Sequence, residues 1–239
     1  MKIIKTLHQW PLSKVELVEI KNKKFILKTI HKDFIDEVYR QKLLRKKCRK
    51  IKIPKIYWIK KNKEVSFLMD IIPHKNEKIS KNILDEMIAE FHEDTRNIRS
   101  KYFKVYDIET FYKDFKQIKK YLKSELRHKN KNQTMNFFKI VFDSPRSVVH
   151  GDWGDDQILG ERGKHYIVDF GKSFYGPSIL DYNEPKSKSK ELNLKAKLVF
   201  LIIELAWLDL CKRKYINYDY KKEISEKVKK FSEIEKRLK

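Results

Sequence analysis

The sequence predicts an α+β protein with a β-rich part over residues 1–73 and a mostly helical part over residues 74–239. Two observations support this fold class. After residue 80, apolar residues recur at spacings of three and four, which is typical of amphipathic helices. Before it, four apolar runs rich in β-branched residues alternate with polar turns, and they cover residues 15–20, 25–30, 51–58 and 65–72.

The four runs of the β-rich part pair into two predicted hairpins. Lys21 to Lys24 form the polar turn of the first hairpin, and Lys60 to Lys63 form that of the second. Between the hairpins, an apolar stripe predicts a helix over residues 33–49 with Asp33 as its N-cap. Residues 1–10 are polar and short, and no element is predicted there.

The second part contains five predicted helices and one short hairpin. The hairpin covers residues 158–168, with a polar turn from Gly160 to Lys164. Because a hairpin brings its two ends together, we expect Asp152 and Asp169 to lie near each other. The helices are predicted over residues 80–95, 108–126, 135–142, 194–211 and 220–238.

Composition limits the function classes. The net charge of +23 would suit binding to nucleic acid or to a membrane surface. Because lysine and arginine are spread along the whole chain, we interpret the charge as a solvated surface and expect neither partner. Cys48 and Cys211 lie far apart, without metal-like spacing, and neither a membrane-spanning run nor a signal-peptide pattern is present. We therefore expect reduced thiols in a cytoplasmic protein.

Two carboxylates carry the chemical signal. Asp152 follows His150 and a glycine, and Asp169 begins an Asp-Phe-Gly segment. An aspartate on a loop can accept the proton of a substrate hydroxyl. A second aspartate after a strand, with an amide oxygen such as that of Gln157 nearby, can hold magnesium against the phosphates of ATP. Each motif alone is weak, but the two in this order and spacing point to phosphoryl transfer.

The pattern resembles the catalytic loop and Asp-Phe-Gly element of the protein-kinase-like fold. It is most similar to the aminoglycoside and choline phosphotransferase family, which has His-Gly-Asp where protein kinases usually have His-Arg-Asp. Gly154-Asp155, and Gly176-Pro177 followed by Asp181, also resemble that family. The resemblance implies a two-lobed fold, with a small β-rich N-lobe over residues 1–73 and a mostly helical C-lobe over residues 74–239.

The resemblance also implies an activity and its catalytic residues. The chain would be a small-molecule kinase that transfers the γ-phosphate of ATP to a hydroxyl, with Mg²⁺ as cofactor. Asp152 would accept the hydroxyl proton, and His150 would support the loop by a hydrogen bond to the backbone near Asp169. Asp169 would hold magnesium with Gln157, which stands where the family has asparagine.

The nucleotide-binding residues implied by the resemblance come from the β-rich part. Lys28, which ends Phe-Ile-Leu-Lys, would contact the α- and β-phosphates, and Glu37 on the following helix would position it. Residues 1–24 contain no glycine for a phosphate loop, so Ser13 would offer a hydroxyl in its place. In the hinge-like segment, the adenine contacts would be the Met69 side chain and the backbone of Asp70 and Ile72.

The substrate and two alternatives stay open. An aminoglycoside, choline, a sugar, a cell-wall precursor or a protein side chain could carry the hydroxyl. Gln157 and the missing glycines also suit a kinase-like nucleotide-binding protein with little or no activity, and the charge suits a basic nucleic-acid- or membrane-binding module. Clustering of Lys and Arg on one face would favour the module. A pocket for a cationic substrate would need several carboxylates, and the candidates are Asp155, Asp156, Asp181, Glu184, Glu204 and Asp209.

Overall fold

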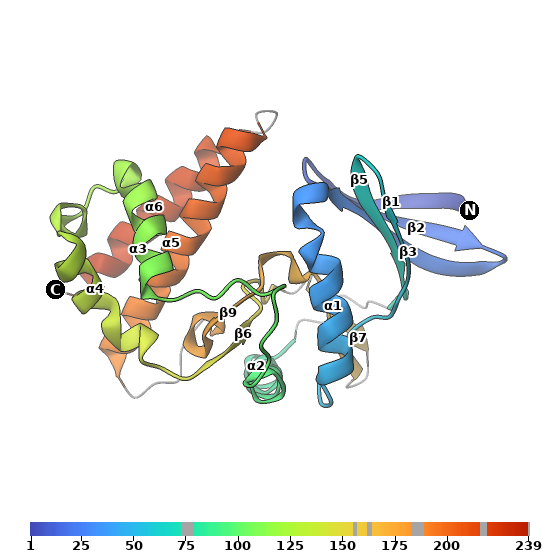
Figure 1. Ribbon diagram of the computed structural model, residues 1–239, viewed down its shortest axis with the longest axis horizontal. Coiled ribbons are helices and arrows are strands. Elements are labelled where there is room, and N and C mark those ends of the chain that lie inside the picture. The colour runs from blue at the N-terminus through green and yellow to red at the C-terminus, as the bar shows by residue number, and fades with distance from the viewer. Residues whose placement is uncertain (73–78, 155–156, 162–163, 183–188, 216–218, 239) are drawn as a thin grey trace. The chain divides into compact units, whose positions relative to one another are not determined.

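The computed structural model describes residues 1–72, 79–154, 157–161, 164–182, 189–215 and 219–238. The chain forms two compact units (Figure 1). The first comprises Met1–Lys104 and His150–Phe174, and the second comprises Val105–Val149 and Tyr175–Lys239. A β-sheet in the N-terminal region and helices in the C-terminal region confirm the predicted α+β class. The predicted lobe boundary between residues 73 and 74 falls outside the described residues and stays a prediction.

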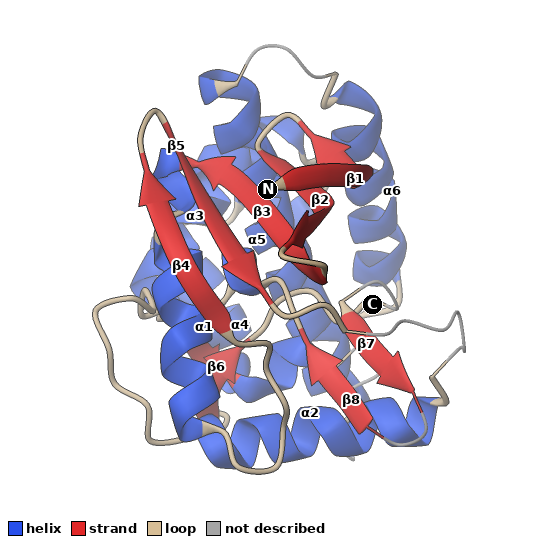
Figure 2. Cartoon of the chain, turned by 90° about the vertical axis from the view of Figure 1, so that its right-hand side faces the viewer, coloured by secondary structure: helices blue, strands red, loops and turns tan. Residues whose placement is uncertain are grey.

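A five-stranded antiparallel sheet dominates the first unit (Figure 2). Its order is β1-β2-β3-β5-β4, so that β1 and β4 are the edge strands. Both predicted hairpins are present. The strands are β1 (Lys2–Trp10), β2 (Ser13–Ile20), β3 (Lys23–His31), β4 (Ile56–Lys61) and β5 (Glu64–Met69).

Strand β1 is an element that the sequence did not predict. Eight of its nine residues are exposed, so backbone pairing with β2, and not burial of one face, holds it in the sheet. The apolar alternation used to recognise strands therefore carried no signal there. The following turn is short, since Trp10 already pairs with Ser13.

The first predicted turn is shorter than expected. Ile20 pairs with Lys23, so only Lys21 and Asn22 lie in the turn, with φ of 50° and 61°. Left-handed backbone at both turn positions matches the twist of the two strands, which allows them to pair up to the turn. The predicted strand over residues 51–58 begins only at Ile56, because side chains from the preceding helix bind the backbone carbonyls of Ile53 and Pro54.

Helix α1 (Asp36–Lys47) packs on one face of the sheet. Val38 shares a buried cluster with Ile30 of β3 and with residues of β4 and β5. The prediction of Asp33 as the N-cap is wrong. Its backbone N–H donates to His31 Nδ1 (3.3 Å) in a 3-10 turn over Lys32–Phe34, and α1 begins only after that turn, without a side-chain cap.

The remaining described elements of the first unit are one helix, one hairpin and the turn that contains part of the Asp-Phe-Gly motif. Helix α2 (Lys81–Thr95) begins at the predicted position, with the Ser80 hydroxyl accepting from the N–H of Ile83. Strands β7 (Ile158–Glu161) and β8 (Lys164–Ile167) form the predicted hairpin. A 3-10 turn over Phe170–Lys172 follows Asp169 directly.

The second unit is mostly helical. Its helices are α3 (Ile108–Ile118), α4 (Lys131–Phe142), α5 (Lys190–Lys214) and α6 (Lys221–Lys236), and a short β6 (Arg146–Val149) pairs with β9 (Phe174–Pro177). The helix predicted over residues 108–126 stops at Ile118 and continues as separate 3-10 turns. Helix α4 starts earlier than predicted because Asn130 and Gln133 form a capping box. Within the described part of the chain, no helix combines the length and apolarity needed to cross a membrane.

Candidate active site

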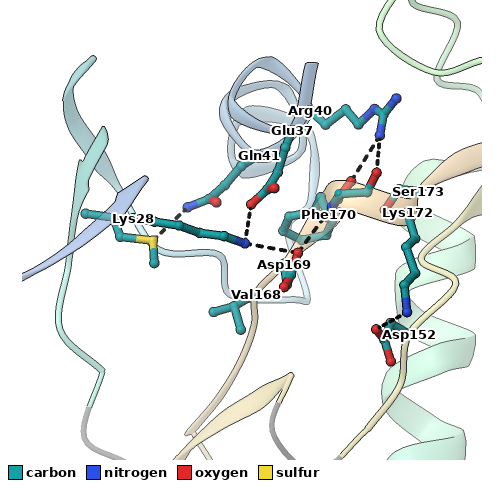
Figure 3. A network of polar contacts seen from close by, with 12 residues as sticks. Lys28, Glu37, Arg40, Gln41, Asp152, Val168, Asp169, Phe170, Lys172 and Ser173 are labelled. Carbon is teal, nitrogen blue, oxygen red and sulfur yellow. Dashed lines mark hydrogen bonds and ion pairs between the residues drawn. The ribbon is translucent and has the colours of Figure 1, made fainter. Parts of the chain in front are cut away.

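Two carboxylates share one buried ammonium group in the first unit (Figure 3). Lys28 Nζ lies 2.6 Å from Glu37 Oε1 and 3.1 Å from Asp169 Oδ1. The side chains of Lys28 and Glu37 are almost fully buried, whereas that of Asp169 is 41% exposed. The structure thus brings together three residues that are separated by up to 141 positions in the sequence.

Local geometry explains how these three side chains meet. Side chains of a strand alternate between its two faces. Lys28 therefore lies on the same face of β3 as Ile26 and Ile30, which is the face that α1 covers. Asp169 has left-handed backbone, with φ of 62°, and its carboxylate accepts from the N–H of Gly171 (3.4 Å).

Gly171 leaves room for both carboxylates. A Cβ at this position would lie 3.2 Å from Glu37 Oε2 and 3.3 Å from Asp169 Oδ1, closer than most carbon atoms approach. The glycine of the Asp-Phe-Gly motif therefore leaves space beside the charged cluster, and a side chain here would force one of the two carboxylates to shift.

The charges of the cluster act on one another. Burial opposes the charge on Lys28, but Asp169 and Glu37 outweigh it and raise the pKa of the ammonium group. Burial raises the pKa of Glu37 from 4.5 to about 6, although Lys28 pulls in the opposite direction. Burial also opposes ionisation of Asp169, but Lys28 outweighs it and lowers the pKa of this carboxyl. Asp169 is thus the carboxylate that stays ionised most readily, and it is also the more exposed one.

Two residues of α1 that the sequence analysis missed hold neighbouring backbone segments in place beside the Lys28 cluster. The Arg40 guanidinium donates to the carbonyls of Phe170 (3.2 Å) and Gly171 (2.9 Å), which ties the helix to the Asp-Phe-Gly turn. The Gln41 amide donates to the Pro54 carbonyl (3.0 Å) and contacts Met69 Sδ (3.7 Å). Both act on backbone or sulfur atoms far away in the sequence, so no local motif marked them.

His150 links the two motif segments. Its Nδ1 accepts from the N–H of Asp152 (3.2 Å), so Nε2 carries the proton and donates to the Val168 carbonyl (2.9 Å). The expected hydrogen bond to the backbone beside Asp169 is therefore present. The ring is fully buried, and it packs against Phe170 and Trp153, with centroid distances of 5.0 Å and 5.2 Å.

Asp152 lies at the surface of the first unit and has a partner that the sequence analysis did not identify. Lys172 Nζ is 2.9 Å from Asp152 Oδ2, and the two side chains are 39% and 34% exposed (Figure 3). The Ser173 hydroxyl, next in sequence, donates to the His150 carbonyl (3.2 Å). The turn after Asp169 therefore contacts both the side chain of Asp152 and the backbone of its loop.

Gln157 lies at the base of the β7–β8 hairpin. Its carbonyl accepts from the N–H of Val168 (3.0 Å), which places its backbone beside the residue that precedes Asp169. Carboxylate and amide oxygens are ligands that suit magnesium, and magnesium on a nucleotide needs only one or two protein ligands. The described residues contain no group of three His, Cys, Asp or Glu side chains that would hold a metal by themselves.

Several of the residues predicted to contact adenine and phosphate are already hydrogen-bonded within the protein or at least partly buried. The Asp70 N–H donates to the Lys55 carbonyl (3.1 Å), and the Asp70 carboxylate accepts from the Lys55 N–H (2.8 Å) and the Tyr57 hydroxyl (2.6 Å). Met69 is buried at the end of β5, and Ile72 is half-buried. Ser13 is half-buried at the start of β2, immediately after the β1–β2 turn.

Two of the candidate carboxylates for a cation pocket, Asp209 and Glu204, are paired with basic side chains of the protein. In the second unit, Asp209 is buried and bound by Gln117 Nε2 (2.7 Å), Lys120 Nζ (2.7 Å) and Arg213 Nε (3.0 Å). Glu204 pairs with Lys227 on α6 (2.6 Å). Asp181 is also buried. The candidates Asp155, Asp156 and Glu184 lie outside the described residues.

Comparisons with known proteins identify the fold. No protein-family model and no curated protein matches the sequence. Solved structures do match, among them aminoglycoside phosphotransferase APH(4)-Ia at 11% identity and a TM-score of 0.63, over 96% of this chain and 93% of that one. A thermostable mutant of that enzyme was solved as a ternary complex with AMP-PNP and hygromycin B.

Two kinases of other small molecules match equally well. A choline/ethanolamine kinase family protein from Mesorhizobium loti has 9% identity and a TM-score of 0.65, over 96% of this chain and 87% of that one. Choline kinase from Cryptosporidium parvum Iowa II has 10% identity and a TM-score of 0.62, over 98% and 89%. The chain therefore has the protein-kinase-like fold that aminoglycoside phosphotransferases share with choline and ethanolamine kinases.

Proposed function

We propose that the protein is an ATP-dependent phosphotransferase that transfers the γ-phosphoryl group to a hydroxyl of a small molecule. The observation that carries this proposal is the buried Lys28 ammonium, held between Glu37 (2.6 Å) and Asp169 (3.1 Å). Such a cluster is costly to bury, and it matches the arrangement that phosphoryl transfer on this fold needs. Structural neighbours that bind AMP-PNP support a nucleotide as the ligand.

In the proposed reaction, each residue of the cluster has its own task. Lys28, oriented by Glu37, binds the α- and β-phosphates. Asp169, the more exposed and readily ionised carboxylate, would hold Mg²⁺ together with Gln157. Magnesium supplies positive charge against the phosphate oxygens when it is bound. Most of the rate enhancement then comes from positioning and from charge stabilisation.

Asp152 acts on the acceptor. Its carboxylate accepts the proton of the substrate hydroxyl while the hydroxyl oxygen bonds to the γ-phosphorus and the bond to the β-phosphate oxygen breaks, which releases ADP. Its ion pair with Lys172 (2.9 Å) fixes the direction of the carboxylate. His150 holds the backbone of the loop against the segment that carries Asp169.

The charge distribution favours a neutral or anionic acceptor over a polycationic aminoglycoside. The chain carries a net charge of +23, which repels polycations and attracts ATP. Two of the carboxylates that could have lined a cation pocket, Asp209 and Glu204, are already neutralised by basic side chains of the protein. We therefore expect a hydroxyl on a sugar-like or phosphorylated small molecule to be the better substrate.

The first test is thermal unfolding with and without Mg·ATP, for the wild type and for Asp169→Asn. Ligand at about a hundred times its dissociation constant stabilises a protein by about 2.7 kcal/mol. The expected result is a magnesium-dependent rise in the midpoint that is lost in Asp169→Asn and retained in Asp143→Asn, which removes an exposed carboxylate paired with Lys139. A wild type that does not respond to Mg·ATP would refute the proposal.

A second candidate function is nucleotide binding without transfer. Two observations favour it: Gln157 replaces the family's asparagine, and the β1–β2 turn is too short to wrap around phosphates, since Trp10 pairs with Ser13. This candidate predicts the same stabilisation by Mg·ATP but no phosphorylated product. Mass spectrometry of a panel of hydroxyl compounds after incubation with ATP separates the two functions.

A further inference from the structure

Over half of the net charge of the chain lies in one short segment. Residues 38–63 contain twelve lysines and arginines and no aspartate or glutamate, so that they contribute +12 to the net charge of +23. The expectation that the basic residues are evenly spread is therefore wrong for this stretch. A charge concentrated in one place is an argument for a partner, whereas a scattered charge is not.

This segment belongs to the first unit and is held in a folded conformation. It comprises most of α1, the connection over residues 48–55, and the edge strand β4. Side chains of α1 hold the connection, with Gln41 Nε2 3.0 Å from the Pro54 carbonyl and Arg45 Nη1 2.5 Å from the Ile53 carbonyl. The Lys52 carbonyl accepts from the N–H of Ile167 (3.0 Å), which fixes the connection to β8. The charges are thus displayed on a folded scaffold.

We call the exposed lysines and arginines of residues 42–63 the basic face. It contains nine lysines and two arginines. Among the residues that the structure describes, Lys50 alone of these eleven forms an ion pair, with Glu93 (2.8 Å). Two further acids nearby, Asp94 and Asp70, accept hydrogen bonds from backbone N–H groups of the segment. Salt or an anionic partner would reduce the mutual repulsion of the remaining positive groups.

We propose that the basic face docks the protein on a membrane surface that contains anionic phospholipids. Lysine-rich clusters of this size bind such surfaces through the sum of many weak attractions, without specific contacts. Lysine is a strongly hydrated point charge, whereas arginine is the residue that grips single phosphates in bidentate fashion. The predominance of lysine, and the use of the Arg45 guanidinium on a carbonyl, fit a diffuse negative surface better than a nucleic-acid backbone.

The aromatic residues of the same region support this choice. Binding of single-stranded nucleic acid uses exposed rings on which bases stack. Here Tyr39 is stacked on Tyr102 with a centroid distance of 4.8 Å, and Lys61 Nζ lies 5.1 Å from the Tyr39 centroid. Tyr57 is 47% exposed, but Lys55 Nζ lies 4.9 Å from the centre of its ring. A lysine of the protein thus lies over each ring, and tyrosine is a residue that suits the polar boundary of a bilayer.

The test is co-sedimentation with vesicles of phosphatidylcholine alone and of phosphatidylcholine with phosphatidylglycerol, in the absence of nucleotide. The expected result is binding only to the anionic vesicles, and binding that falls as salt is raised above about 0.1 M. The face variant changes four exposed lysines without ion pairs, Lys46→Gln, Lys47→Gln, Lys60→Gln and Lys63→Gln. A matched control removes the same charge from α6, by Lys221→Gln, Lys222→Gln, Lys229→Gln and Lys230→Gln, which are exposed too.

Each lysine near an anionic surface contributes up to about fivefold to binding. The face variant should therefore bind at least about tenfold more weakly than the wild type, while the α6 control keeps most of the binding and both variants keep the wild-type unfolding midpoint. Equal losses in the two variants would overturn the proposal, because net charge alone would then explain binding. Absence of wild-type binding at low salt, or tighter binding to a single-stranded RNA oligomer than to the vesicles, would overturn it as well.

This result is independent of the proposed enzymatic activity. Asp169→Asn alters the nucleotide cluster and none of the lysines of the basic face, so it should bind anionic vesicles as the wild type does. A variant that loses its response to Mg·ATP and keeps vesicle binding therefore separates the two proposals. Loss of vesicle binding in Asp169→Asn would overturn the assignment of binding to the basic face.

Discussion

Replacing Glu37 by glutamine tests the central feature of the site, which is that two carboxylates share one buried ammonium group. The substitution keeps the shape of the side chain and removes one charge. The pKa of Glu37 is raised from 4.5 to about 6 in the folded protein, so its ionised form is disfavoured there. A shift of about 1.5 units corresponds to about 2 kcal/mol, since one unit is about 1.4 kcal/mol.

The sign of the pH dependence follows from the direction of the shift. Because the folded state binds this proton more tightly than the unfolded state, the contribution of Glu37 to stability is fully present below pH 4.5 and is lost as the pH rises through about 6. The unfolding free energy of the wild type minus that of Glu37→Gln should therefore fall by about 2 kcal/mol in total, and by about 1.2 kcal/mol between about pH 5 and about pH 7.

The assay is urea unfolding of the wild type and the variant at a series of pH values. Taking the difference between the two proteins removes the contributions of titrating groups that lie away from the Lys28 cluster. Glu93→Gln serves as control, since it makes the same chemical change in an exposed ion pair with Lys50 (2.8 Å), where solvent screens the interaction. A difference that is flat with pH, or that grows as the pH rises, would refute the burial of an ionisable Glu37 beside Lys28.

Three further predictions concern the same site. Asp152→Asn should reduce turnover by at least about a hundredfold and leave stabilisation by Mg·ATP intact; equal loss of both would contradict its role as the base. Lys172→Met should lower kcat by about tenfold and Lys172→Arg should restore it, because the cation lies 2.9 Å from the Asp152 carboxylate; similar kcat values for both variants would exclude this positioning. Gly171→Ala should lower the unfolding free energy by about 1–3 kcal/mol, since its Cβ would lie 3.2 Å from Glu37 Oε2; an unchanged urea midpoint would mean that the cluster is loosely packed.

Much of the fold could be predicted because burial leaves a periodic trace in the sequence. The strands of the two predicted hairpins each bury at least part of one face, and α2 and α3 bury regular apolar stripes. Strand β1 buries none of its residues, so it left no such trace. Boundaries failed where a local hydrogen bond decided the outcome, as at Asp33, whose N–H joins a 3-10 turn.

The site residues that belong to recognisable sequence motifs could be predicted. The Lys28–Glu37 ion pair and the hydrogen bond from His150 to the backbone beside Asp169 are contacts that the resemblance implied. Arg40 was missed because its partners are backbone carbonyls 130 and 131 positions away. Backbone atoms are the same in every residue, so the sequence carries no sign of which carbonyl a long side chain will reach.

The β1–β2 turn, which contains no glycine, is held against the sheet. This bears on how phosphates would be bound. Leu12, in the β1–β2 turn, is buried, and its carbonyl accepts from the N–H of His31 at the end of β3 (3.0 Å). The turn is thus fastened to the sheet and is not available to close over a ligand. Glycine-rich loops bind phosphate through backbone N–H groups that approach closely, and a fastened turn offers few of them. In the proposed reaction, phosphate binding would then depend more heavily on Lys28 and on Mg²⁺ at Asp169, which would make these two side chains less replaceable here than in kinases with a glycine-rich loop.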